Sequence, residues 1–226
     1  MIWSKSMYRS GLSSLLIVAL GLGLSSDARA QDSSITWQSR LNNIWSRIIK
    51  DDEDKDRPWG SRGDVCAIAP TNPNAGTPII WHNQPVIVWQ AGTVAKVSLQ
   101  NTFDETLWEY VPSADETHVV YDGEPLQPGQ TYTLALHNIA SLGPTLIPDF
   151  QVMHPIFRSL VGNGLENSFM PNEFTVSNEE WMAIHQADYF SKRELSFDAI
   201  QSLFSVSDPS SELLAIQEQV IEEACD

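Results

Sequence analysis

Between residues 58 and 153, hydrophobic positions form short clusters separated by segments rich in Gly, Pro, Asn and Asp. Apolar and polar side chains alternate within several clusters, most clearly in Val94–Gln100. A period of two is typical of strands with one buried face, and strands that recur about every eight to twelve residues are typical of a β-sandwich. The predicted strands are Val65–Ala69, Thr77–Trp81, Pro85–Trp89, Val94–Gln100, Thr106–Val111, Thr117–Tyr121, Thr131–Asn138 and Phe150–Met153.

The segment before this region has a helical period. Apolar residues between positions 31 and 50 recur at spacings of three and four, which predicts one amphipathic helix. The charged run at 51–57 (DDEDKDR) predicts a solvated linker. Because tryptophans and basic residues suit a membrane interface, a weak membrane-surface contact through residues 35–50 is the alternative to docking on the protein itself. The apolar stripe consists of Trp37, Leu41, Ile44, Trp45, Ile48 and Ile49.

The pattern becomes helical again after the last predicted strand, so residues 154–226 are predicted to form a helical appendage. Gly162 and Gly164 are expected to loosen its first helix. Ser177 and Glu180 have the spacing of a capping box at the start of the second helix. The predicted helices run from His154-Pro155 to about Glu166, from Asn178 to about Arg193, from Ser196 onward and from Asp208-Pro209 onward.

The stretch Leu126-Gln127-Pro128-Gly129-Gln130-Thr131-Tyr132 has the pattern of a tyrosine corner. In such a corner the leucine fills the core, Pro-Gly turns the chain between the sheets, and the tyrosine hydroxyl bonds back to the turn backbone. The structural corner residues are therefore predicted to be Leu126, Pro128, Gly129 and Tyr132. Trp89, in an otherwise aliphatic strand, is predicted to lie in the core.

Residues 1–30 have the three parts of a secretory signal peptide. Lys5 and Arg9 supply the positive n-region, and Gly11–Leu24 supplies an apolar h-region. Ala28-Arg29-Ala30 matches an A-x-A cleavage site. We therefore expect an exported protein of the periplasm or the extracellular space, with an uncleaved N-terminal anchor as the alternative.

The chain has two cysteines, Cys66 and Cys225, and both follow the predicted cleavage site. In an oxidising compartment an even pair favours one disulfide. The alternative is two free thiols, one of them close to the C-terminus.

Several motifs together resemble a known family. Their order is a Trp-containing helix and a charged linker, followed by residues 60–66 (GSRGDVC), 80–85 (IWHNQP), 88–90 (VWQ), 126–132 (LQPGQTY), 150–152 (FQV) and 198–199 (DA). This order resembles a family of secreted cyanobacterial proteins of unknown function whose core is similar to an immunoglobulin or fibronectin type III sandwich. The resemblance implies a mainly β chain with an antiparallel sandwich over residues 58–153, an N-terminal amphipathic helix and a C-terminal helical appendage. It implies no catalytic residue.

Charge and motifs exclude several functions. The formal net charge of −16 disfavours nucleic-acid binding, which depends on Lys and Arg contacts with phosphates. None of the common metalloprotease, serine-hydrolase, P-loop or Cys-x-x-Cys motifs is present, so no catalytic residue and no cofactor are predicted. His118 and His137 fall on predicted strands, but a zinc site needs further ligands, and no metal site is predicted.

Three functions remain after these exclusions. The first is a non-catalytic structural or interaction module of the cell envelope that binds a protein partner through its sandwich. The second is a small-molecule or glycan-binding domain that stacks its ligand on Trp81 and Trp108 beside His82. The third is a hydrolase without a recognisable signature. We expect the first, with an exposed sheet edge or loop end as the binding surface.

Overall fold

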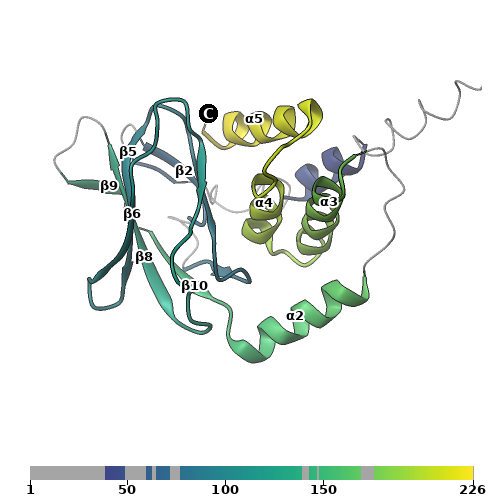
Figure 1. Cartoon of the computed structure of the whole chain (residues 1–226), viewed down its shortest axis with the longest axis horizontal. Coiled ribbons are helices and arrows are strands. Elements are labelled where there is room, and N and C mark those ends of the chain that lie inside the picture. The colour runs from purple at the N-terminus through teal and green to yellow at the C-terminus, as the bar shows by residue number, and fades with distance from the viewer. Residues whose placement is uncertain are drawn as a thin grey trace, which may run out of the picture.

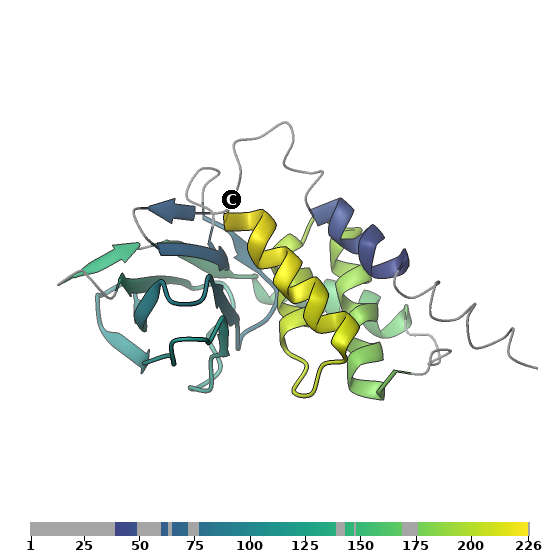
Figure 2. The same cartoon turned by 90° about the horizontal axis from the view of Figure 1, so that it is seen from above.

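The computed structural model describes residues 39–48, 60–62, 65–71, 77–138, 143–146, 148–168 and 176–225. In this part of the chain two β-sheets face each other, and a group of helices covers the outer face of one sheet (Figure 1; Figure 2). The predicted signal peptide, the charged linker, Trp37 and Ile49 lie outside the described residues.

Ten strands form two sheets in the described part of the chain. They are β1 (Gly60–Arg62), β2 (Val65–Ala69), β3 (Ile79–Ile80), β4 (Val86–Trp89), β5 (Val94–Asn101), β6 (Thr106–Tyr110), β7 (His118–Val120), β8 (Thr131–Asn138), β9 (Pro144–Leu146) and β10 (Asp149–Val152). The four-stranded sheet has the order β1-β2-β4-β7. The six-stranded sheet has the order β3-β10-β8-β5-β6, with β9 paired to β8.

Each of the predicted strand segments contains an observed strand, and two differences concern short strands. The short β1 and β9 fall outside the predicted strand segments. The pairing of β3 with β10 is parallel, whereas the prediction was wholly antiparallel. A two-residue strand is too short for its sequence to indicate whether it pairs parallel or antiparallel with its neighbour.

The two central strands of the four-stranded sheet, β2 and β4, are buried on both faces. Val65 and Ala67 of β2 and Trp89 of β4 pack toward the six-stranded sheet. Ile68 of β2 and Val88 of β4 are on the opposite face and pack toward the helices. Strands that are buried on both faces have continuous apolar sequences, which explains the unbroken runs VCAIA and VIVW in β2 and β4.

The helices form the third layer and share a core with β2 and β4. They are α2 (Pro155–Asn167), α3 (Asn178–Ser191), α4 (Ser196–Phe204), α5 (Ser211–Cys225) and an N-terminal helix whose described part covers residues 39–48. Four residues of the predicted apolar stripe of the N-terminal helix are buried in this shared core: Leu41, Ile44, Trp45 and Ile48. The protein itself therefore covers these four residues of the stripe.

The helix signals were correct for α3 and partly wrong elsewhere. Ser177 caps α3 by accepting a hydrogen bond from the Glu180 amide at 3.1 Å. Ser196 is the first residue of α4 and does not cap it, since Leu195 occupies the cap position. The last helix, α5, begins at Ser211 rather than at Asp208-Pro209, and the hydroxyl of Ser210 accepts a hydrogen bond from the Leu213 amide at 3.2 Å.

The glycines of α2 do not interrupt the helix, contrary to expectation. A Cβ on Gly164 would collide with the hydroxyl of Tyr189. That hydroxyl donates to the Val161 carbonyl at 2.9 Å, so the glycine allows the two helices to approach closely. Its role here is packing.

The corner segment turns the chain as its pattern requires. Gly129 has a φ of +86°, a conformation that favours glycine. The Gln127 amide donates to the Tyr132 hydroxyl at 2.8 Å. Leu126 is buried in the core between the sheets. The segment therefore fixes the entry of the chain into β8.

The structure supports the sandwich-like arrangement of the two sheets. More of the described residues are helical than extended, so the mainly β character belongs to the segment from β1 to β10 rather than to the whole chain.

Candidate functional site

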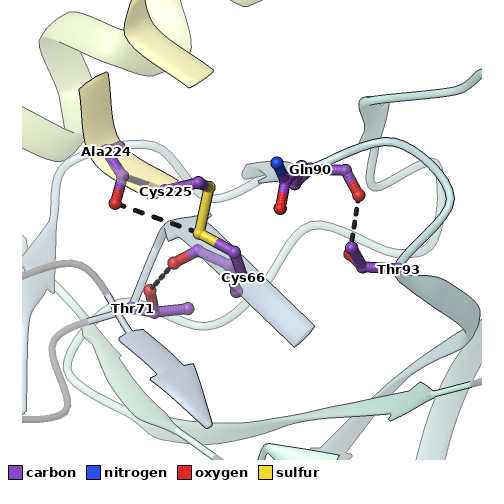
Figure 3. The surroundings of a disulfide bond; sticks show 7 residues. Cys66, Thr71, Gln90, Thr93, Ala224 and Cys225 are labelled. Carbon is purple, nitrogen blue, oxygen red and sulfur yellow. Dashed lines mark hydrogen bonds between the residues drawn. A yellow bond between two sulfur atoms is a disulfide. The ribbon is translucent and has the colours of Figure 1, made fainter. Parts of the chain in front are cut away.

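A disulfide joins the last helix to the four-stranded sheet, as the two cysteines predicted. Cys66 on β2 is bonded to Cys225 at the end of α5 across a sequence separation of 159. Figure 3 shows the bond between the last turn of α5 and the strand. The neighbouring Ile68 packs into the core that the sheet shares with the helices, so the bond links two elements that already pack together.

The segment after β3 forms a second attachment for the helices. Asp198, in the first turn of α4, is fully buried. Its carboxylate accepts hydrogen bonds from the Trp81 amide at 2.9 Å and from the His82 amide at 3.2 Å. The Nδ1 atom of His82 lies 2.7 Å from the same carboxylate. One buried acid therefore holds the segment against α4.

The pair of His82 and Asp198 has the chemistry of two members of a hydrolase triad. A triad also needs a nucleophile within hydrogen-bond reach of the imidazole. In the described part of the chain no hydroxyl or thiol forms a hydrogen bond with His82, and its ring packs against Trp81 and Phe190. The contacts of this pair are those of a structural joint.

Trp81 lies half-buried in the same joint. Its Nε1 donates to the Arg158 carbonyl at 2.9 Å, and the Arg158 guanidinium lies 5.2 Å from the ring centroid. The Phe190 ring lies 5.5 Å away, so neighbours in the protein already pack against the indole. A shallow groove of about 350 Å³ runs beside it. Its lining includes Pro128, Pro155, Ser159, Asn163 and Glu166.

Trp108 lies on β6, at the opposite edge of the six-stranded sheet from β3. Its ring is stacked on Tyr110 with a centroid distance of 5.7 Å and meets the Tyr121 ring edge-on at 5.5 Å. Its Nε1 donates to Asp122 at 2.6 Å. The structure therefore does not bring Trp81 and Trp108 together, and each belongs to its own cluster.

The histidines that could form a metal pair lie on different sheets. His118 is on β7 and His137 is on β8. Burial lowers the pKa of both rings, and the nearby charge of Lys96 lowers the pKa of His137 further. Among the residues that the structure describes, no three His, Cys, Asp or Glu side chains are grouped as metal ligands would be. None of the described helices has the length and apolar character of a membrane span.

A charge cluster attaches the N-terminal helix to α3. Asp188 on α3 is buried, and its carboxylate oxygens lie 3.4 Å from Arg40, 2.9 Å from Arg47 and 2.7 Å from Lys192. Burial raises the pKa of Asp188, but hydrogen bonds from Lys192 and Arg47 and the charges of Lys192 and Arg40 outweigh it, so the net pKa is lowered. This cluster supports the packing of the apolar stripe.

Exposed apolar side chains gather on β6 and its hairpin. Phe103 is 80% exposed, Val111 72% and Leu107 44%. β6 is a terminal strand of its sheet, and among the described strands it pairs with β5 alone. With five residues it is longer than the other terminal strands β1, β3 and β7. An exposed terminal strand presents unpaired backbone groups that can accept another strand.

Side chains hold both ends of β6 in place. At its start, the Asn101 side-chain oxygen accepts hydrogen bonds from the amides of Phe103 and Glu105, at 2.9 and 3.0 Å. At its end, the Glu116 carboxylate accepts from the Tyr110 hydroxyl at 2.6 Å. This hydrogen bond, followed by burial, raises the pKa of Tyr110. The strand is therefore ordered before any partner binds.

We call the exposed side chains of this strand and its hairpin the β6 edge surface. It comprises Phe103, Asp104, Glu105, Leu107, Glu109 and Val111. The six-stranded sheet lies on the side of the sandwich away from α3, α4 and α5, so these helices do not cover it (Figure 1; Figure 2).

Sequence reasoning did not single out this surface, although one signal was present. Leu107 and Val111 alternate with Trp108 and Tyr110, so β6 is apolar on both faces. Trp108 and Tyr110 pack against the core between the sheets, whereas Leu107 and Val111 are exposed.

No known family model matches this chain, and no characterised protein matches its sequence.

Proposed function

We propose that this protein is a non-catalytic, exported interaction module that binds a protein partner through the β6 edge surface. The observation that carries the proposal is an exposed terminal strand with apolar side chains on its surface and with side-chain hydrogen bonds at both of its ends. Exposed apolar patches rimmed by polar residues mark interaction sites. Here the apolar side chains are accompanied by the exposed acidic residues Asp104, Glu105 and Glu109.

Export is part of the proposal. The A-x-A site and h-region of residues 1–30 favour secretion, and a Cys66–Cys225 disulfide is compatible with an oxidising compartment. We also propose that the sandwich is of the immunoglobulin or fibronectin type III kind found in the secreted cyanobacterial family that the sequence resembles. The core position of Trp89 and the hydrogen bond of Tyr132 support this assignment.

The experiment is capture of partners from an envelope extract of the source organism with three forms of the protein. They are the natural protein, the double variant Leu107→Lys/Val111→Lys, and the control Leu160→Lys. Leu160 is 63% exposed on α2, outside the β6 edge surface, so this control introduces a lysine at another exposed apolar position. We expect the natural protein and the control to retain one saturable partner, and the double variant to lose it.

Two outcomes would contradict the proposal. The first is that no protein binds saturably. The second is that the β6 variant retains the partner as fully as the control does. Loss of the partner in the Leu160→Lys control alone would indicate that the partner binds to α2 instead.

The glycan-binding alternative would use the groove beside Trp81. Because Arg158 and Phe190 pack against the indole, a sugar would have to bind mainly through the polar residues of α2. Titration with a panel of oligosaccharides while tryptophan fluorescence is recorded tests this alternative. We expect no saturable change, and a saturable change that Asn163→Ala abolishes would favour the glycan function instead.

A further inference from the structure

The β6 edge surface fits one mode of binding and one kind of partner. We propose that an extended, basic segment of the partner adds to β6 as a further strand of the six-stranded sheet. This inference depends on the proposed function, because it specifies the partner and the geometry for the same surface.

The backbone of β6 is suited to strand addition. In an antiparallel pair, alternate residues direct their N–H and C=O groups toward the neighbouring strand and the others direct them away. Trp108, Glu109 and Tyr110 pair in unbroken register with β5. The bulge in this pair lies at the hairpin end, where Leu107 is the extra residue, because Leu99 pairs with Trp108 and Gln100 with Thr106. The outward backbone groups are therefore regularly spaced from Trp108 to the end of the strand.

Natural edge strands are commonly protected by short length, charged residues (lysine above all), proline, a bulge or a covering element. In β6 the bulge is confined to the hairpin end and the charge is that of Glu109, which attracts a basic strand. The sequence of β6, TLWEY, contains neither lysine nor proline. Its middle pairs regularly with β5, and α3, α4 and α5 lie on the other side of the sandwich. An ordered strand of this kind binds an extended peptide with little entropic cost on its own side.

The side chains of β6 define the pattern of the added strand. On the outer face of the sheet, Leu107 and Val111 flank Glu109. Glu109 already forms a surface salt bridge with Lys96 on the β5 side, at 2.9 Å. Neighbouring strands favour apolar pairs and opposite charges. An incoming strand that places apolar residues beside Leu107 and Val111, with a basic residue between them, satisfies both preferences.

The charge around the strand favours a basic partner over a second copy of this chain. Residues 96–124 contain one lysine, Lys96, and no arginine. The acidic residues of the same segment are Asp104, Glu105, Glu109, Asp115, Glu116, Asp122 and Glu124. The whole chain carries a formal charge of −16, so two copies repel each other, whereas a basic segment is attracted.

The test measures binding of a fluorescein-labelled peptide, Lys-Thr-Val-Thr-Lys-Thr-Val-Thr-Lys, by fluorescence anisotropy; its valines and lysines alternate on one face of the strand, so that a lysine lies between two valines. Two further peptides carry N-methyl groups on either all the threonines or all the other residues. Because alternate N–H groups of a strand point to opposite sides, only one of these sets faces β6. We expect one methylated peptide to bind at least about tenfold more weakly and the other to bind within about threefold of the parent.

Charge and position are tested separately. A peptide with glutamate in place of lysine is expected not to bind. The Leu107→Lys variant is expected to bind the parent peptide about tenfold more weakly, while Leu160→Lys binds it normally. The urea midpoint of each variant verifies that it is folded, and the methylated peptides probe the natural protein without any substitution.

Equal binding of the two methylated peptides would overturn strand addition, and so would equal loss of both. Equal binding of the glutamate peptide would overturn the requirement for a basic partner. If no peptide binds but the extract partner is lost in the β6 double variant, this inference fails and the proposed function stands. If the extract partner is also absent, both fail.

Discussion

At the residue scale, the Tyr132 hydroxyl connects a turn to the strand that follows it. The hydroxyl is an acceptor for the Gln127 amide, and the side chain is 6% exposed. The substitution Tyr132→Phe leaves this amide without its partner, and we expect it to lower the free energy of unfolding by about 1 kcal/mol. Urea denaturation monitored by circular dichroism measures the change through the midpoint at constant slope.

A matched control for Tyr132 is Tyr110→Phe. This hydroxyl bonds to Glu116 beside solvent, so its loss is expected to cost less than about 0.5 kcal/mol. Equal midpoints for Tyr132→Phe and the natural protein would contradict the role of the hydroxyl in the corner.

Asp188 makes the stability of the helical layer depend on pH. Its pKa is lower in the folded protein than the value of about 3.9 expected for an unfolded chain. Its ionised form therefore contributes stability above about pH 4, and that contribution is lost as the pH falls through the folded pKa. We expect Asp188→Asn to lower stability by about 2 kcal/mol at pH 7. We also expect the variant to show a shallower loss of stability on acidification.

Urea denaturation of both proteins from pH 7 down to acid measures this difference. The two curves of unfolding free energy should converge at low pH. Curves that stay parallel across the whole range would show that the ionised carboxylate contributes no stability.

The structural roles of some single residues could be predicted from the sequence. The corner residues were identifiable because Leu, Pro, Gly and Tyr have distinct tasks at fixed spacings. The structural roles of Asp188 and Asp198 could not be predicted, because an aspartate on a helix is usually exposed to solvent and their partners are distant in the sequence. Their partners, Arg47 and His82, are more than 100 positions away.

At the element scale, the continuous apolar runs of β2 and β4 are the sequence signal of the helical layer. Strands such as VCAIA and VIVW indicate burial on two faces, and hence a third layer over the sheet. The helices were expected as an appendage because their own amphipathic periods do not reveal which surface they cover. The exposed β6 could not be distinguished from a buried strand, since its position at a sheet edge depends on long-range pairing.

Asp198 is the strongest single link between α4 and the sheets. The substitution Asp198→Ala leaves the amides of Trp81 and His82 without an acceptor in a fully buried position. We expect it to lower the free energy of unfolding by about 3 kcal/mol. Thermal and urea unfolding both measure this loss.

Two further variants test whether the loss of stability in Asp198→Ala comes from the missing hydrogen-bond acceptor. Asp198→Asn keeps one acceptor oxygen and is expected to be intermediate. Asp149→Ala, on the exposed side of β10, is expected to cost less than about 0.5 kcal/mol. If Asp198→Ala were no more harmful than Asp149→Ala, the hydrogen bonds of Asp198 would contribute nothing to the attachment of α4.

At the scale of the whole molecule, the helices and the sandwich act as one body because they share a core and a disulfide. One consequence concerns binding. The described helices α3, α4 and α5 pack on the four-stranded sheet, which leaves the six-stranded sheet and its β6 edge open to a partner (Figure 1). The molecule thus separates the face that stabilises it from the face that we propose to bind.

The disulfide provides a test of that unity. It closes a loop of 159 residues, and constraining such a loop in the unfolded chain is worth about 5 kcal/mol in the entropic treatment, with measured values commonly between about 2 and 5. Leu213 and Val220 of α5 are buried in the core that the helices share with β2 and β4, and this packing does not involve the bond. The double variant Cys66→Ala/Cys225→Ala should therefore still fold, with a free energy of unfolding lower by about 3 to 4 kcal/mol. Hydrogen exchange should accelerate first in the last turns of α5, because the bond anchors that end of the helix to β2, while β8 keeps its protection.

Adding reductant to the natural protein should reproduce the same loss, and reductant should not change the variant. If the natural protein were equally stable with and without reductant, α5 would be held by packing alone and the bond would contribute nothing to the union of the two parts.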